Sequence, residues 1–490
     1  MEDVSQSQTD VNPGASAQQE ISGGVPDLIR LSEIPTNMIQ QVETDLLDPV
    51  VQNDPATGTG FCRFTLQNKG FLHSHSKVFL SIVPDAGNSQ ACPPLSVGIG
   101  AVIQKAVLKV GNQVINEISD WQNLHAVKSS LIAGELNKER EQYLTGRSVC
   151  HRFLHDEAGV LQGRQASNII IDNGVEVSGA TLRFPDALNM DGTSVATQAE
   201  SPSYAVDLSD LFPFLKVHQL PLYMIDQPVN IELTYAPQVQ RRVCVATGGT
   251  ATDPYALDLT ETKFCADYIF YGAGDEMEQY RLANQDMTFS FVDYRLNSAS
   301  VNYTGASQNL VRNIGMANRL VTRVITIFSP EPDAGDELLC SYGALAPSKS
   351  AIVTAGDGSK SGGIVSDFRY NIRYNDRFEF ASDVNNTARL FSLLTDAESV
   401  PFVTREEYAH EGELLAPVAT CSLLGRDMSV NLGGHFFYNS TRLTGGRVGQ
   451  RGIELHVEGA MPTGAKTIRS YCEYLRVARL RNGKFELFNA

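Results

Sequence analysis

Apolar residues recur at every second position through much of this 490-residue chain, and this period constrains the fold more than any other feature. Cys62, Phe64 and Leu66 alternate with polar residues, and residues 229–233 repeat the pattern directly after Pro228. Successive side chains of a strand point to opposite faces, so the pattern predicts half-buried strands in antiparallel sheets. The same reasoning predicts strands at 78–82, 107–110, 114–118, 264–271 and 287–294.

Helical signals are few. Residues 124–143 have partial helical periodicity and many good helix formers. Residues 275–285 form the other candidate, because Asp275 can cap a helix and Glu278 follows it three positions later, as in a capping box. This segment lies between two strong strand signals, so it is interpreted as a helical linker between two β domains.

Three short segments of the first half have counterparts in the second half, in the same order. Residues 108–115 and 372–379 both read as strand, polar turn and strand, and Ile-Glu-Leu occurs at 231–233 and at 453–455. An aromatic-Cys pair occurs at 264–265 and again at 471–472. The ordered matches predict two related domains, with longer loops in the first. Near the end, Asn482-Gly483 between alternating strands predicts a tight hairpin.

These signals predict an all-β chain, and many short strands generally close into sandwiches, barrels or jelly rolls. Residues 1–26 are rich in Ser, Gln, Gly and acids, so a disordered N-terminal arm is expected there. The expected division is the arm at 1–26, a first domain at 27–272, a linker helix at 273–286 and a second domain at 287–490.

Charge argues against a protein that coats nucleic acid. The net charge is −17, and residues 1–35 carry six acids and one base. Such a chain does not neutralise phosphates, so no direct, sequence-specific contact with nucleic acid is expected. The first ten residues lack a signal-peptide pattern, and no apolar run approaches the ~20 residues needed to span a bilayer. Eight scattered cysteines without a CxxC pair predict reduced thiols that pack as small hydrophobes, as expected for folding inside a cell.

Four landmarks resemble one family, the major capsid proteins of tailless DNA viruses with the double jelly-roll fold. The segment 110–121 reads as strand, Gly-Asn turn, strand and then Asp120-Trp121. A Leu-Pro segment at 219–223, in the family a strand, precedes Ile-Glu-Leu at 231–233, and an Asp-Tyr strand at 267–271 precedes the acidic segment and a fresh strand. Tyr374-Asn-Asp-Arg-Phe378, followed by 390–394, is similar to the family's turn in the second roll, although the usual glycine is missing. The chain is similar to proteins of virophages, Polinton-like viruses and algal large DNA viruses and, more distantly, to adenovirus hexon.

The resemblance implies two tandem eight-stranded antiparallel jelly rolls with a short helical linker and long loops. It also implies a structural protein, not an enzyme, whose homotrimers form pseudo-hexagonal capsomers that tile an icosahedral virion shell assembled inside the host cell. The implied partners are neighbouring capsomers, penton proteins and minor capsid or cement proteins, and an internal membrane is left open as a further one. No cofactor is implied. Segments 189–203, 244–256 and 344–363 are candidate tower or interface loops.

Candidate chemical sites are all interpreted as non-catalytic and free of metal. His151 and His155 have the spacing of a metal-binding helix but lack the Glu of the HExxH pattern, and His410 fails that pattern too. His73 and His75 would share one face of a strand, and are interpreted as surface histidines. The Gly-rich segment 356–363 lacks the phosphate-loop order, and 189–192 lacks the spaced acids of a calcium loop.

The remaining candidate residues are also interpreted without a chemical function. Glu406-Glu407 is interpreted as a solvated acidic pair, and the glycosylation patterns at Asn302, Asn385 and Asn439 as chance. Trp121, the one tryptophan, is assigned to core or interface packing. A carbohydrate-binding or carbohydrate-active β-sandwich is the alternative function. A single tryptophan argues against it, because sugar sites usually stack sugars on aromatic rings.

Overall fold

The computed structural model describes about half of the chain, and the account below is confined to that part. The described residues are 39–55, 59–83, 91–92, 98–130, 144–145, 153–155, 161–163, 176–177, 180–181, 203–236, 244–245, 256–271, 278, 281–283, 286–303, 308–330, 369–383, 438–443, 447–459 and 464–489. Antiparallel strands dominate them, as the alternating pattern predicts.

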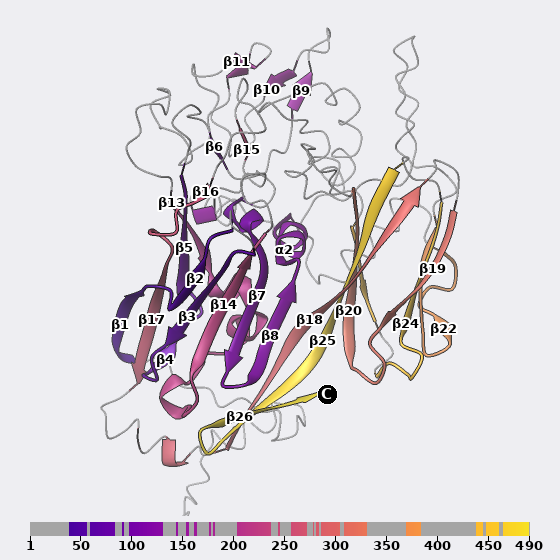
Figure 1. The fold of residues 1–490 in the computed structure, drawn as a ribbon. Coiled ribbons are helices and arrows are strands. Elements are labelled where there is room, and N and C mark those ends of the chain that lie inside the picture. Colours follow the sequence, from indigo (N-terminus) through magenta and orange to yellow (C-terminus); the bar gives the residue numbers. More distant parts are fainter. Residues whose placement is uncertain are drawn as a thin grey trace, which may run out of the picture.

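Two facing sheets make the first roll (Figure 1). One sheet has the order β1(Ile39–Leu47), β17(Lys263–Tyr271), β5(Lys77–Val83) and β13(Ser203–Asp207), with β4(Phe71–Leu72) and β16(Ala256–Leu257) paired at its ends. The other has the order β2(Val51–Asn53), β3(Phe61–Leu66), β14(Val229–Tyr235), β7(Ile103–Val110) and β8(Gln113–Ser119).

The order of these strands is that of a jelly roll. When β1, β3, β5, β7, β8, β13, β14 and β17 are numbered one to eight along the chain, the two sheets read 1-8-3-6 and 2-7-4-5. In each sheet, strands from the first half of the roll (one to four) alternate with strands from its second half (five to eight). This is the double Greek key of a jelly roll.

The second roll repeats this order with eight strands of its own. One sheet runs β18(Asp286–Tyr303), β25(Gly464–Arg481), β20(Val321–Pro330) and β23(Tyr438–Arg442), with β26(Lys484–Asn489) paired to β25. The other runs β19(Gln308–Gly315), β24(Ile453–Gly459), β21(Arg369–Tyr374) and β22(Arg377–Phe378). Numbered along the chain, the sheets again read 1-8-3-6 and 2-7-4-5. The fold is thus the predicted tandem pair of eight-stranded jelly rolls.

The three ordered sequence matches fall on equivalent strands of the two rolls. Residues 108–115 and 372–379 are the hairpins β7–β8 and β21–β22, the fourth and fifth strands. The Ile-Glu-Leu segments lie in the seventh strands, β14 and β24, and the aromatic-Cys pairs lie in the eighth strands, β17 and β25. The weak internal repeat therefore reflects a real structural repeat.

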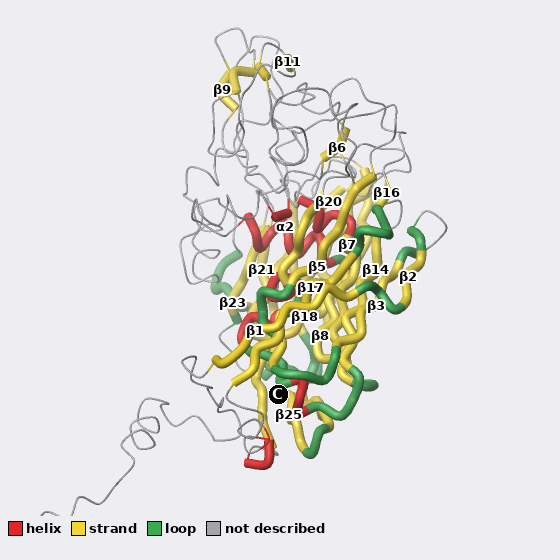
Figure 2. The backbone as a smooth tube through the Cα atoms, turned by 90° about the vertical axis from the view of Figure 1, so that its left-hand side faces the viewer, coloured by secondary structure: helices red, strands yellow, loops and turns green. Residues whose placement is uncertain are grey.

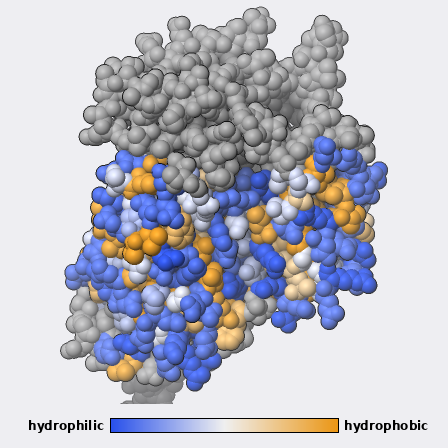
Figure 3. All heavy atoms as spheres, in the orientation of Figure 1, coloured by the Kyte–Doolittle hydropathy of each residue, from blue (hydrophilic) through white to orange (hydrophobic). Residues whose placement is uncertain are grey.

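Each roll encloses apolar side chains between its sheets, and both contribute to one continuous cluster of buried residues. On β3, for example, Cys62 and Phe64 are fully buried and Leu66 is nearly so, while the intervening residues are at least partly exposed. On the face drawn in Figure 3, exposed apolar residues form several small patches over both rolls, among hydrophilic ones. Among the described residues, no helix combines the length and apolarity that a membrane span requires.

The short helices differ from the sequence expectations. A helix expected at 124–143 is α2(Trp121–Ser130) in the structure, so it begins three residues earlier, and residues 131–143 lie outside the described part. Between β13 and β14 the chain forms α4(Leu208–Leu211) and α5(Pro213–Val217), neither of which was expected.

The expectation of a Leu-Pro strand at 219–223 is wrong. Only Leu220 makes a β-bridge, to Leu72, and residues from Leu222 to Met224 form the 3-10 turn η5. Pro221 lacks an N–H group, so it cannot donate to a strand ladder, and a turn satisfies this segment better.

Outside the two rolls, little of the predicted linker and arm is described. Glu278 and residues 281–283 are helical, while Asp275 and the arm at 1–26 lie outside the described residues. The two-stranded pieces β9(Phe153–His155) with β10(Leu161–Gly163), and β11(Glu176–Val177) with β12(Ala180–Thr181), lie beyond one end of the first roll (Figures 1 and 2). β6(Ala91–Cys92) and β15(Cys244–Val245) pair near the same end (Figure 1).

Candidate functional site at the seam between the two rolls

The two rolls meet along a seam between the edge strand β8 of the first roll and the strands β18 and β25 of the second (Figure 1). Helix α5 packs on β18, and β26 reaches back to β8. No strand ladder joins the rolls in the described residues, and besides one backbone hydrogen bond, from the Asp226 N–H to the Gly483 carbonyl at 3.0 Å, side chains make the connection described below.

A buried hydrogen bond between Asn116 and Asp293 lies at the centre of this seam. Asn116 on β8 is fully buried, and its Nδ2 donates to Oδ1 of Asp293 on β18 at 3.1 Å. Its Oδ1 accepts from the backbone N–H of Phe214 in α5 at 3.0 Å. One amide side chain thus ties two elements of the first roll to the second.

Asp293 also binds the neighbouring strand of its own roll. Its Oδ2 accepts from the Tyr474 hydroxyl at 3.0 Å and from Arg476 Nη1 at 2.8 Å, while Oδ1 also accepts from the Tyr294 N–H. The same Arg476 nitrogen donates to the carbonyl of Ile115 on β8 at 2.8 Å. Both carboxylate oxygens of Asp293 accept hydrogen bonds, so the cluster is suited to holding the two rolls in one relative position.

An aromatic cluster continues the seam from this polar centre. Phe214 of α5 contacts Phe289 and Phe291 of β18, with ring centroids 5.6 and 5.0 Å apart in edge-on geometry. Phe485 of β26 stacks on Phe289 at 5.8 Å. Nearby, His218 donates from Nε2 to the Ser290 carbonyl at 2.7 Å, and burial lowers the pKa of this histidine, which favours the neutral ring. Buried apolar area supplies the main attraction here, and edge-on geometry adds about 0.5–1.5 kcal/mol per pair.

Charged groups close the other side of the seam. Asp120, between β8 and α2, accepts at its backbone carbonyl from the Tyr471 hydroxyl at 2.8 Å and at its carboxylate from Arg469 Nε at 3.2 Å. Asp120 has φ of +48°, a left-handed conformation that Asp tolerates better than most residues, and the contacts from β25 fix it. Lys128 of α2 contacts the Tyr294 hydroxyl, which in turn donates to Glu473.

The two buried acids of the seam have opposite pKa shifts. Burial raises the pKa of Asp293 above its ordinary value, although Arg476 and the donors Asn116 and Tyr294 act against this shift. Burial would also raise the pKa of Glu473, but Lys128 and Arg323, helped by two hydroxyl donors, hold its pKa below the ordinary value. Glu473 therefore remains ionised at lower pH than a free glutamate.

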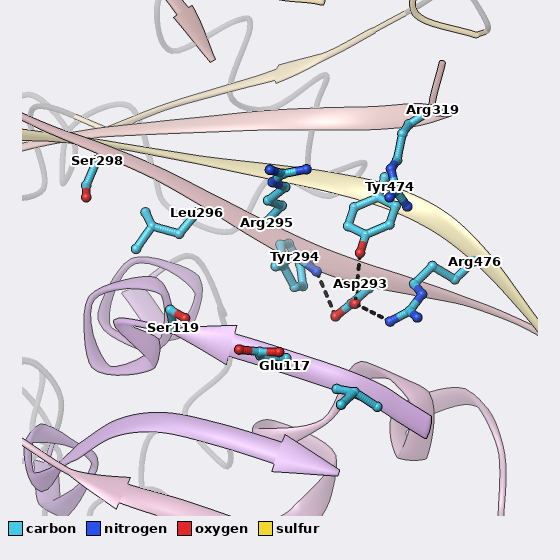
Figure 4. Close-up of a pocket in the computed structure, with 11 residues that line it drawn as sticks. Glu117, Ser119, Asp293, Tyr294, Arg295, Leu296, Ser298, Arg319, Tyr474 and Arg476 are labelled. Carbon is cyan, nitrogen blue, oxygen red and sulfur yellow. Dashed lines mark hydrogen bonds and ion pairs between the residues drawn. The ribbon is translucent and has the colours of Figure 1, made fainter. Parts of the chain in front are cut away.

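Beside this cluster the seam opens into a cleft of about 640 Å³. In Figure 4, Asp293 lies between Tyr474 and Arg476, and faces the β8 side of the cleft, where Glu117 and Ser119 lie. Arg295 and Arg319 line the same space. Burial raises the pKa of Tyr474 to about 12, so this phenol is neutral at physiological pH.

Of the histidine and glycosylation candidates, the structure describes the side chains of His73, His75 and Asn302 and places Asn439 on a strand. His73 and His75 lie close together, with ring centroids 5.1 Å apart, and Nδ1 of His75 is 3.4 Å from Asp207. Burial and the neighbouring His75 lower the pKa of His73. No group of three metal-ligating side chains occurs among the described residues. Asn302 is exposed on β18, and Asn439 lies on β23.

Trp121 has the packing role predicted for it. It is 1 % exposed, stacks on His125 at 4.4 Å and donates from Nε1 to the Asp210 carbonyl at 3.1 Å. A ring buried in this way is not available to stack on a sugar. His151, Asn385, Glu406-Glu407, His410 and the segments 189–192 and 356–363 lie outside the described residues, as does the side chain of His155.

Three cysteines are described with their side chains, and all three are unpaired thiols. Cys62 and Cys472 are buried, and burial raises the pKa of each to about 12. A thiol with such a pKa is not a nucleophile at neutral pH, so these two behave as the small hydrophobes predicted from the sequence.

The sequence reasoning missed the seam itself. Asn116, Asp293 and Arg476 are polar residues within strongly alternating strands, and each lies far from its partners in sequence. One signal in the sequence could have indicated the seam. Asp293 lies on the same face of β18 as Phe289 and Phe291, so a charged residue follows two aromatic residues on a face that is otherwise apolar.

Comparison with solved structures finds capsid proteins of similar fold. The mavirus major capsid protein aligns over 96% of this chain and 93% of its own, with 9% identity and a TM-score of 0.50. The Faustovirus major capsid protein aligns over 94% and 93%, with 9% identity and a TM-score of 0.51. PBCV-1 VP54, in a structure fitted into a cryo-EM reconstruction of the virophage Sputnik, aligns over 94% and 99%, with 11% identity and a TM-score of 0.50.

No protein-family model matches the chain, and no curated protein matches it in sequence. At such low identity the structural matches establish the fold alone. Each extends over nearly the whole of both chains, so the shared fold comprises both jelly rolls together.

Proposed function

We propose that this chain is the major capsid protein of a tailless icosahedral DNA virus, and that it acts in the virion as a structural protein and not as an enzyme. The observation that carries the proposal is the jelly-roll strand order repeated twice in one chain and joined at a fixed seam. Whole-length alignment with three viral capsid proteins supports it.

In the proposed assembly, three chains surround a three-fold axis, so that six similar rolls give a capsomer with a pseudo-hexagonal outline. Capsomers tile the shell and contact one another, penton proteins and minor capsid or cement proteins. The proposal leaves open an internal membrane as a further partner. The net charge of −17 argues against direct binding of the enclosed nucleic acid by this chain.

The proposed domain division follows the two rolls. The first roll would occupy 27–272 and the second 287–490, with the linker helix at 273–286 between them and a disordered arm at 1–26. Support comes from the sheets, because every strand pairing in the described residues lies within 39–271 or within 286–489.

Light scattering coupled to size exclusion tests the oligomer, and negative-stain electron microscopy tests its shape. The chain has a mass of 53.4 kDa, so a trimer is expected at about 160 kDa. Particles should have a hexagonal outline or form shells. A stable monomer at high protein concentration would overturn the proposal, and binding on a glycan array would then favour the carbohydrate-binding alternative.

A further inference from the structure

The seam inside one chain shows which surface of a roll receives the next roll. The second roll contributes the outer face of β18 and β25, its first and eighth strands, where Phe289, Phe291 and Asp293 meet the first roll. The first roll contributes β8, its fifth strand and the edge of its sheet, together with α5. An edge therefore packs against a face, and the two surfaces differ.

The same two kinds of surface occur a second time, at opposite sides of the molecule. The first and eighth strands of the first roll are β1 and β17, and the fifth strand of the second roll is β22. In Figure 1, β1 lies at the far left of the first roll and β22 at the far right of the second. Neither takes part in the seam, so among the described residues each is a second copy of one kind of seam surface.

The surface on β1 exposes apolar side chains that a strand facing water would not need. Val42 and Leu46 lie on one face of β1 and are 57 % and 58 % exposed. On the partner strand, Leu46 is opposite Cys265 and Val42 is opposite Ile269, which is buried under Phe71 and Tyr271. A hydrogen bond from Thr44 to Asp267 lies between these two apolar pairs. Val50, after β1, is also exposed. This apolar face corresponds to the one that α5 and β8 cover on β18.

The edge at β22 is apolar and rich in arginine. Phe378 is 48 % exposed, and Arg377 beside it is exposed with its guanidinium over the Tyr374 ring. Arg369 and Arg373 lie on the adjoining strand β21 and pair with Glu458 and Glu454. On β1, Glu43 and Asp45 alternate with Val42 and Leu46 and pair with Lys69, so these acids belong to the opposite face of the strand. What the two surfaces share is exposed apolar side chains.

We propose that the β1–β17 face of one copy receives the β21–β22 edge of a second copy of this chain, in the way that β18–β25 receives β8 within the chain. Such a contact is head-to-tail, and it forms a closed ring when the rotation between copies closes. The inference rests on the proposed function, because it names the surfaces through which the trimer would close.

Two substitutions, one on each surface, test the pairing. Leu46→Arg places a charge in the proposed contact from the β1 side, and Phe378→Arg places one in it from the β22 side, where burial without a partner is costly. Both side chains are about half exposed in the single chain, so the folded monomer should tolerate either change. Each variant is expected to lose the trimer peak in light scattering and to keep the circular dichroism spectrum of the unaltered chain.

Val311→Arg is the matched control. Val311 is 54 % exposed and lies on β19, the opposite edge of the sheet that ends in β22. This control is expected to remain a trimer.

Mixing the two disrupted variants gives the sharpest result. A Leu46→Arg chain retains an intact β22 edge, and a Phe378→Arg chain retains an intact β1 face, so one good contact remains between them, whereas the other contact would bring the two new arginines together. The mixture is expected to form a one-to-one dimer of about 107 kDa, twice 53.4 kDa, and to grow no further. A mixture that stays monomeric at all concentrations tested would overturn the pairing of these two surfaces.

The experiments can distinguish failure of this inference from failure of the proposed capsid function. If the unaltered chain is a monomer, the proposed function fails. If the unaltered chain is a trimer and both variants are trimers too, the capsid proposal stands and the assignment of these surfaces is wrong.

Discussion

Asn116 and Asp293 are 177 residues apart in sequence, and a buried hydrogen bond of 3.1 Å joins them across the seam between the two rolls. Two jelly rolls with apolar cores do not need such a contact to fold separately. Its direction and burial instead favour one relative placement of the rolls, because a placement that broke this bond and kept Asn116 buried would take from its amide N–H group the acceptor that Asp293 provides.

Replacing Asn116 should therefore weaken the whole molecule. Asn116→Ala removes a donor to Asp293 and leaves the Phe214 N–H without its acceptor, at about 1–3 kcal/mol for each buried group. The expected loss of unfolding free energy is about 2–5 kcal/mol, measured by denaturant titration. The matched control is Asn230→Ala, because Asn230 bonds to Thr65 at an exposed position, and it should cost about 0.5 kcal/mol or less. Equal losses from the two variants would contradict a special role for the seam.

Glu473 predicts how stability depends on pH. Its pKa is lower in the folded chain than in the unfolded chain, so its contribution is complete above the unfolded value, near 4.5, and is lost as the pH falls through the folded value. Glu473→Gln removes this titration. The difference in unfolding free energy between the unaltered chain and this variant should shrink as the pH falls from about 6 to about 3. A difference that stays constant over that range would show that Glu473 does not act through its charge.

Trp121 provides an optical probe of the first roll. Since this indole is buried and is the one tryptophan of the chain, its fluorescence should be at short wavelength in the folded protein and shift to the red on unfolding. Trp121→Ala should cost about 3–5 kcal/mol, because it leaves a cavity beside His125. Trp121→Phe keeps an aromatic ring there and should cost less, which calorimetry can measure. Red emission from the native protein would contradict the burial.

Substitution of two glycines in the second roll can distinguish the cost of backbone strain from the cost of steric crowding. Gly315 and Gly452 have φ of +85° and +77°, so alanine is strained at either position by about 1 kcal/mol. A Cβ on Gly315 would meet nothing within 4 Å, whereas a Cβ on Gly452 would lie 2.9 Å from the Gly315 carbonyl carbon. Gly452→Ala should therefore cost about 1–3 kcal/mol more than Gly315→Ala in thermal unfolding. Equal melting temperatures would count against this close approach.

The strands and the repeat could be predicted because their signals are local. Gly111 has φ of +57° in the turn between β7 and β8, and Asn482 and Gly483 both have positive φ in the turn between β25 and β26. Such turns leave a mark in a few adjacent residues, and alternation of apolar side chains leaves one in each strand.

The seam and the short helices could not be predicted for the opposite reason. Phe214 reads as one more apolar residue until α5 places it against Phe291 of the other roll. Likewise, nothing near Arg476 in sequence indicates that its guanidinium binds the Ile115 carbonyl, 361 residues away. Contacts of this kind depend on how two complete rolls are placed, and one sequence holds no local record of that placement.

The pairing of β18 with β25 has a mechanical consequence. The ladder is continuous from Asp286 opposite Arg481 to Tyr303 opposite Gly464, and its lower part carries the seam while the rest forms a wall of the second roll. Hydrogen bonds between antiparallel strands lie perpendicular to the strands, so a pull along the strands loads all of them at once in shear. Tension along the strands would therefore meet high mechanical resistance, because many hydrogen bonds would have to break together. A force that peels one strand sideways would meet less resistance, because it breaks the bonds one after another.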